Sequence, residues 1–325
     1  MKRRTVLQVA GATLAMPVWA FAQTTKTYRL GWLLTSDESA TKPFIESFLA
    51  GMRERGYVVG KNLVVDLRYT KGDANRLPGL TDELIALKPD ALMGIESACR
   101  VMAARTKTIP IVITGSVDPV AAGLVKSLSR PGTNVTGMSN QADLLISKQI
   151  ELLTEIMPRM SRVGLLSDAT YAGRAIYEQA AQAAAKAKGL TLVIAGARDA
   201  ESVGQAFADL KKNRVDAVAV AGTGPMFFWR KAVVEGATRS RLPTSHPIAQ
   251  FVEIGGLFSY ATNLHASYRS EVSDFVDRIF KGANPAELPV QQSSRFELVV
   301  NLKTAREIGV TIPQSILLRA DRVIE

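Results

Sequence analysis

Short apolar runs recur along the chain and alternate with stretches whose apolar residues have helical spacing. The run YRLGWLL at residues 28–34 is typical of a buried strand. In the stretch that follows, residues 42–56, the side chains of Phe44, Phe48 and Met52 share one helical face. This order predicts a strand followed by a helix that packs on it, and the order is repeated through most of the chain.

The alternation gives a full set of expected elements. Strands are predicted at residues 28–34, 63–69, 91–95, 109–114, 135–139, 162–167, 190–195, 215–220, 243–246 and 257–261. Helices are predicted at residues 42–56, 76–87, 98–106, 119–128, 143–157 and 265–280, with alanine-rich helices between the later strands and a tail from residue 284. Strands that alternate with helices are typical of parallel sheets covered on both faces. We therefore expect an α/β protein with two doubly wound, Rossmann-like lobes that divide near residue 140.

The first 22 residues have the pattern of a secretory signal peptide. Residues 2–4 are basic, residues 6–20 are mostly apolar, and residues 20–22 (AFA) have the small-x-small pattern of a cleavage site. A membrane anchor is the alternative, but a spanning helix needs about 20 apolar residues and this stretch is shorter. We expect a periplasmic protein; because the arginine pair at 3–4 resembles a twin-arginine signal, export by the Sec or by the twin-arginine route stays open.

Composition narrows the function further. A length of 325 residues favours two lobes over one core. The net charge of +10 loses three charges with the signal peptide, and the remaining basic residues are scattered, so we expect no nucleic-acid partner. The single cysteine excludes an intrachain disulfide framework and a multi-cysteine metal site. No motif of a nucleophile elbow, P-loop, dinucleotide-binding loop or zincin is present, so we expect no catalysis, no cofactor and no metal.

Candidate ligand-binding residues follow from the predicted topology. Ligands of open parallel sheets bind beyond the carboxyl ends of the strands, and two facing lobes place two such ends across one cleft. The residues directly after the strands are mostly small hydroxyls, glycines, amides and carboxylates: Thr35, Ser36, Glu96, Ser97, Ala98, Gly115, Ser116, Asp118, Ser167, Asp168, Tyr171, Thr223, His246, Tyr260 and Asn263. The helix start at residues 97–99 could hold an anion on its N–H groups. Each candidate could instead be a cap or turn residue without a ligand contact.

Two of these positions, Asp118 and His246, have a structural interpretation as well, and so does Cys99 beside the helix start. Asp118 precedes Pro119 as an N-cap would precede the first helical position. His246 is either a ligand contact or a structural turn residue. Cys99 is a small buried residue rather than a nucleophile, because only two histidines could serve as its base.

Three segments resemble one family of known proteins. They are residues 118–137 (DPVAAGLVKSLSRPGTNVTG), residues 255–260 (GGLFSY) and the tail from residue 296 (FELVVNLKTAREIGVTIPQSILLRADRVIE). Together they resemble the substrate-binding proteins of ABC transporters, in the tryptophan/phenylalanine-binder-like group. The resemblance implies the type I periplasmic binding fold, with three crossings between lobes and a ligand at the hinge. It implies a first lobe of residues 27–140 plus 262–283 and a second lobe of residues 141–261 plus 284–325.

The resemblance also bears on the ligand. Family members with known ligands bind amino acids, chiefly aromatic ones, and their carboxylate-holding turn commonly reads Thr-x-Ala after the third strand. The matching turn here is Glu96-Ser97-Ala98, which places a negative charge beside the expected anion. Family members also usually carry Asn near position 168 and Asp near position 223, where this chain has Asp168 and Thr223. These departures argue against an ordinary α-amino acid.

We expect a monomeric solute-binding protein that delivers a small amino-acid-like ligand or organic acid to an ABC permease and its ATPase. Ligand bridging both lobes would close the hinge by binding the closed state more tightly. A ligand sensor that presents its closed form to a membrane receptor is an alternative that uses the same cleft. A secreted hydrolase is a third alternative, and the missing nucleophile–base pair argues against it.

Overall fold

The first lobe is built on a six-stranded sheet in a computed structural model that describes residues 26–325. Its strand order is β11-β5-β4-β3-β1-β2, and all pairs are parallel. The strands are β1 (Tyr28–Leu34), β2 (Leu63–Tyr69), β3 (Ala91–Ile95), β4 (Ile111–Gly115), β5 (Val135–Ser139) and β11 (Gln291–Gln292). Helices α2 (Leu77–Ala86) and α3 (Glu96–Arg105) cover one face, and α1 (Glu38–Glu54) covers the other. The short 3₁₀ helix η1 (Ala74–Arg76) precedes α2.

The second lobe has a seven-stranded sheet in the order β13-β12-β10-β9-β8-β6-β7. The pair β10–β12 is the one antiparallel pair among the described strands of this sheet; β13 pairs in parallel with β12, so these two run opposite to the other five. The strands are β6 (Arg162–Asp168), β7 (Thr191–Ala197), β8 (Ala217–Val220), β9 (Thr244–His246), β10 (Phe258–Thr262), β12 (Phe296–Asn301) and β13 (Arg322–Ile324). The helices are α4 (Ala142–Ile156), α5 (Arg174–Ala187), α6 (Ser202–Lys212), α7 (Gly224–Phe228), α8 (Arg230–Ser240), α9 (Ala249–Glu253), α12 (Leu302–Ile308) and α13 (Gln314–Leu317).

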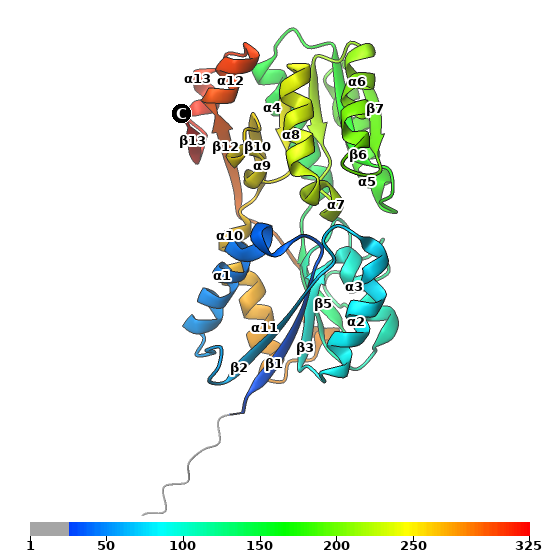
Figure 1. The fold of residues 1–325 in the computed structure, drawn as a ribbon, viewed down its shortest axis with the longest axis vertical. Helices are drawn as coiled ribbons and strands as arrows, with labels where there is room; N and C mark the ends of the chain where they lie inside the picture. Colours follow the sequence, from blue (N-terminus) through cyan, green and yellow to red (C-terminus); the bar gives the residue numbers. More distant parts are fainter. Residues whose placement is uncertain (1–25) are drawn as a thin grey trace, which may run out of the picture.

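The two lobes lie one above the other along the long axis of the molecule, with α7 and α10 near their junction (Figure 1). The predicted α/β class with two parallel-dominated sheets is confirmed. The predicted signal peptide lies outside the described residues. Within residues 26–325, no helix combines the length and the apolar character needed to cross a membrane.

The chain crosses between the sheets three times, after β5, after β10 and after β11. The crossing segments are tied to one another: Gln141 Nε2 donates to the carbonyl of Ser293 over 2.8 Å, and the amide of Asn263 donates to the carbonyl of Arg295 over 2.8 Å. The last crossing comes later in the chain than the expected lobe boundary between residues 283 and 284. The 3₁₀ helix η3 (Pro285–Glu287) and β11 stay with the first lobe because β11 pairs with β5, so the chain leaves that lobe after residue 292.

One predicted helix is absent, because residues 119–128 form turns. The backbone amides of Leu124 and Val125 both donate to the carbonyl of Pro119. Gly123, which lies between Pro119 and Leu124, has a φ of 70°. A residue in the left-handed region ends a right-handed helical turn. The hydrophobic residues of the segment, Leu124 and Val125, are still buried, which explains why the pattern looked helical.

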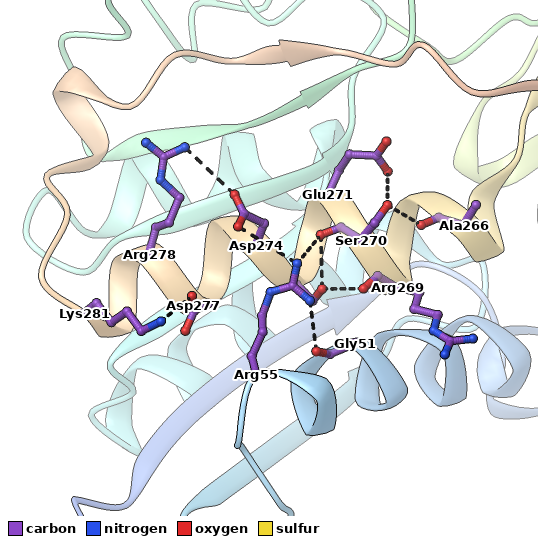
Figure 2. Close-up of polar contacts among 11 residues, drawn as sticks. Gly51, Arg55, Ala266, Arg269, Ser270, Glu271, Asp274, Asp277, Arg278 and Lys281 are labelled. Carbon is purple, nitrogen blue, oxygen red and sulfur yellow. Dashed lines mark hydrogen bonds and ion pairs between the residues drawn. The ribbon is translucent and has the colours of Figure 1, made fainter.

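The helix predicted at 265–280 returns to the first lobe in three parts: α10 (Leu264–Ser267), a π-helical turn η2 (Tyr268–Val272) and α11 (Ser273–Phe280). It crosses α1 at Gly51, where an added Cβ would lie 2.0 Å from the carbonyl oxygen of Arg269. Figure 2 shows Arg55, which follows α1, donating to the carbonyls of Gly51 and Ser270 over 3.0 Å each; its Nη2 lies 3.9 Å from Asp274. These contacts fix the returning helix against the first lobe.

Candidate ligand-binding site

A cavity of about 440 Å³ lies where the carboxyl ends of the two sheets face each other. Nine of the fifteen predicted residues line it: Thr35, Ser36, Glu96, Ser97, Gly115, Ser116, Asp168, Tyr171 and Thr223. They come from the ends of β1, β3 and β4 in the first lobe and from the segments after β6 and β8 in the second. The argument from strand ends therefore brought together residues that are far apart in sequence.

Glu96 is the centre of the polar contacts in the cavity. It is the first residue of α3, and its side chain is only 7% exposed. One carboxylate oxygen accepts hydrogen bonds from the hydroxyl of Ser116 at 2.6 Å and from the amide of Val117 at 3.1 Å. The other accepts from the hydroxyl of Tyr171, in the second lobe, at 2.8 Å. Burial, followed by the negative charge of Glu96, raises the pKa of Tyr171, so this phenol stays a donor.

Asp168 is a second buried carboxylate on the opposite side of the cavity. It is 1% exposed at the end of β6. Its Oδ1 accepts from the amide and the hydroxyl of Thr170, at 2.8 and 2.6 Å, and its Oδ2 accepts from the hydroxyl of Thr223 at 3.1 Å. The hydroxyl of Thr223 also caps α7 by accepting from the amide of Met226 at 3.3 Å. Asp168 therefore fixes two adjacent turns of the second lobe.

Aromatic rings form an apolar part of the cavity that the candidate residues did not include. Trp32 and Tyr268 have ring centroids 5.5 Å apart, and Phe44 lies 5.7 Å from Tyr268. Phe44 also lies 6.1 Å from Phe227 across the gap between the lobes. All four line the cavity. In the sequence, an aromatic residue in a cavity wall has the same spacing as an aromatic residue in the hydrophobic core. The sequence pattern therefore could not distinguish the two positions.

Two further polar residues complete the lining. Arg100 lies one helical turn after Glu96, is exposed, and forms no hydrogen bond or ion pair with the residues that the structure describes. Its spacing of four residues from Glu96 was the signal that could have found it. Ser36 is 1% exposed, and its hydroxyl has no hydrogen-bond partner among the described residues. Such a group is expected to bond to something that enters the cavity.

Six predicted residues lie outside the cavity lining. Three of them have a structural role in the first lobe or beside the hinge. Ala98 packs in the core, with its Cβ 3.0 Å from where a side chain on Gly94 would begin. Asp118 accepts from the amides of Val120 and Ala121 in an exposed turn. Asn263 caps α10.

The other three belong to the second lobe. Ser167 is buried within β6. The ring of Tyr260 stacks on Phe296 at 5.9 Å. His246 is completely buried and stacks on Phe251 at 5.2 Å, with neither ring nitrogen hydrogen-bonded to a described residue. Alternating side chains on a strand point to opposite faces, so a position at a strand end does not by itself select the cleft.

The lobes also touch at two glycines beside the cavity. A Cβ on Gly224, at the start of α7, would lie 2.7 Å from Ile95 and 2.8 Å from the hydroxyl of Thr35. A Cβ on Gly72 would lie 2.3 Å from the ring of Phe228. Both contacts join one lobe to the other, so the lobes are closely packed at these two points of the cavity.

A family model for ABC transporter substrate-binding proteins matches residues 36–324. The chain belongs to this family. It is 24% identical over 266 residues to a tyrosine-binding protein of Clostridioides difficile, which covers 82% of this chain and 76% of that protein. Both sequence and fold thus agree with the resemblance of the three quoted segments.

Several solved structures have the same fold. A Streptococcus pneumonia ABC domain in complex with L-Trp matches with a TM-score of 0.84 and 27% identity, covering 92% of this chain and all of that chain. A conserved domain protein of Vibrio cholerae matches with a TM-score of 0.86 and 27% identity over the same shares. A solute-binding protein bound to benzoate, from R. palustris, shares the type I fold at 14% identity with a TM-score of 0.58.

The family assignment gives no role to the thiol of Cys99. Its side chain is fully buried, and its Sγ donates to the carbonyl of Gly94 at 3.2 Å. Burial, with the nearby charge of Glu96, raises the pKa of this thiol, which suppresses the reactive thiolate. The interpretation of Cys99 as a small buried residue is confirmed.

Proposed function

We propose that this substrate-binding protein captures a small solute between its lobes in the periplasm and delivers it to an ABC permease and its ATPase. The observation that carries the proposal is the interlobe cavity, which is bridged by the hydrogen bond between Glu96 and Tyr171 and by the contacts at Gly72 and Gly224. Its volume of about 440 Å³ falls in the range of small-molecule sites, about 300–1,000 Å³. The signal-peptide pattern of residues 1–22 supports the periplasmic location.

Binding works by hinge closure. The three crossing segments are hydrogen-bonded to one another, so the lobes can rotate about one set of short connections. A ligand that contacts both lobes binds the closed state more tightly than the open state and shifts the population toward it. The closed form is then the form that the permease receives, and no catalytic step is needed.

The ligand class is a small amino-acid-like solute. The relatives support this class, because one is named for binding tyrosine and another is in complex with L-Trp. The aromatic wall of the cavity suits an apolar body of that size. A simple organic acid suits the site less well, because two buried carboxylates, Glu96 and Asp168, face the cavity.

A thermal-shift screen of residues 23–325 tests the proposal. The compounds are amino acids, aromatic acids and amines, nucleosides and sugars. A compound present at 100 times its dissociation constant adds about 2.7 kcal/mol to the free energy of unfolding, which raises the midpoint measurably. If no compound raises it, the solute-binding function in this form is wrong.

A further inference from the structure

We propose that the cavity selects an organic cation, an amine with an apolar or aromatic body and no free carboxylate. This inference rests on the proposed solute-binding function; among amino-acid-like solutes it selects those that keep the amine and lack the carboxylate, and so it departs from the ligands named for the relatives. It is argued from the charge and the hydrogen bonds of the residues that line the cavity.

The carboxylate of Glu96 occupies a cluster of hydrogen-bond donors that could otherwise hold an acidic ligand. Three donors converge on that carboxylate: the Ser116 hydroxyl, the Val117 amide and the Tyr171 hydroxyl, at 2.6, 3.1 and 2.8 Å. Donors from both lobes that meet on one carboxylate are the arrangement needed to hold an acidic ligand. Because Glu96 already uses all three, a second carboxylate would meet a negative charge and find no free donor among them.

The negative charge inside the cavity has no cationic partner within the described chain. Glu96 and Asp168 accept hydrogen bonds from hydroxyl and amide groups only, and no lysine or arginine among the described residues forms an ion pair with either. Buried charges in proteins are normally paired. A cationic ligand would supply the missing charge.

Arg100 forms no ion pair with either carboxylate. It is the one cationic side chain among the described residues that line the cavity, and it is exposed at the rim. Solvent and salt screen an exposed guanidinium strongly. Two buried carboxylates thus face one exposed cation in the lining, and that cation forms an ion pair with neither of them.

Ser36 gives an independent indication of a ligand in the same cavity. Its hydroxyl is 1% exposed, lines the cavity and has no partner among the described residues. A hydroxyl oxygen can accept a hydrogen bond from an ammonium group. The rings of Trp32, Phe44, Phe227 and Tyr268 provide the apolar wall, and their faces attract a cation as well as an apolar body.

Matched compounds that differ only in charge test the inference by calorimetry. One set is 2-phenylethylamine, L-phenylalanine and 3-phenylpropionate, and a second is tryptamine, L-tryptophan and indole-3-propionate. We expect the amine of at least one set to bind at least about 10-fold more tightly than the amino acid, and the acid to bind least. Tighter binding of an amino acid or an acid would overturn the inference and leave the solute-binding function intact.

Absence of binding by both amines would also overturn it, whereas the solute-binding function falls only if the broader screen is empty too. Two variants locate the selectivity. Glu96→Gln and Asp168→Asn keep the side-chain shape and should each reduce the ratio of amine to amino-acid affinity, while Glu307→Gln, which removes an exposed charge outside the cavity, should leave it unchanged. The unfolding midpoints of both cavity variants show whether they are folded. If both are folded and the ratio of amine to amino-acid affinity is unchanged in both, the charge argument is contradicted.

Discussion

The hydroxyl of Tyr171, in the second lobe, donates a 2.8 Å hydrogen bond to Glu96, in the first lobe. The two residues are 75 positions apart in sequence and meet only because the sheets face each other. The bond is charge-assisted and lies in the wall of the cavity. The chain thus supplies one interaction that joins its lobes, and in the proposed function a ligand adds the rest.

Replacing Tyr171 by Phe should favour the open form. The change removes one hydrogen bond to a buried carboxylate, a type of bond that contributes about 1.5–3 kcal/mol. We expect the ratio of closed to open molecules to fall about 10- to 100-fold, and ligand affinity to fall with it. Small-angle scattering of the ligand-free protein measures this as a larger radius of gyration than in the wild type. An unchanged radius and affinity would show that the bond does not contribute to closure.

Replacing Gly224 by Val should hold the lobes apart. The added side chain would overlap Ile95 and Thr35 of the other lobe, where a Cβ alone already lies 2.7 and 2.8 Å from their atoms. The radius of gyration should rise while circular dichroism stays that of the wild type. The matched control is Gly204→Val, at an exposed helical glycine with no atom within 4 Å of an added Cβ. Equal radii for both variants would contradict the proposed contact.

Replacing Gly51 by Ala should destabilise the first lobe, although alanine favours helices. An added Cβ would lie 2.0 Å from the carbonyl of Arg269, so α1 and η2 must separate. We expect a loss of about 1–3 kcal/mol in the free energy of unfolding. Gly204→Ala, in an open position of α6, should gain about 0.5–1 kcal/mol. Urea unfolding of both variants checks the sign, and a gain in Gly51→Ala would refute the close crossing.

The protein should lose stability in acid through His246. Burial lowers the pKa of this histidine from 6.5 to about 3, so the unfolded chain binds the proton more readily than the folded protein. The stabilisation that comes from keeping His246 neutral is complete above the unfolded-state pKa of about 6.5. It is lost as the pH falls toward about 3, where the free energy of unfolding drops by up to about 1.4 kcal/mol per pH unit.

The His246→Gln variant isolates this contribution. We expect the difference in unfolding free energy between about pH 8 and about pH 5 to be smaller in the variant than in the wild type. Urea titrations at both values measure it. A pH dependence identical in the two proteins would mean that His246 is protonated equally in the folded and unfolded states.

Much of the fold follows from local patterns. Each of the ten predicted strands is present, because a buried parallel strand needs a short apolar run. The prediction of a helix at residues 119–128 was wrong because the chain turns at Gly123, and the turn still buries the apolar residues. The spacing of apolar residues carries no information on the backbone angle φ. The strand β11 was missed because two exposed glutamines, Gln291 and Gln292, pair through their backbone.

The ligand-binding site could be predicted from the sequence only in part. Topology identified Glu96, Ser116 and Asp168 as strand-end residues, and the structure places them around one cavity. Phe44 and Arg100 were not among the candidates because each lies inside a helix, where the orientation toward the other lobe depends on tertiary packing. Conversely, His246 ends a strand but faces the core.

The most direct test of the central claim compares ligand stabilisation in the wild type and in Gly224→Val. Both proteins, as residues 23–325, are screened by thermal shift against the amino acids and the matched amines named above. Binding between closing lobes predicts that at least one compound raises the midpoint of the wild type and raises that of Gly224→Val much less. Equal stabilisation of the two proteins, or no stabilisation of the wild type by any compound, would contradict a ligand held by closure of this cavity.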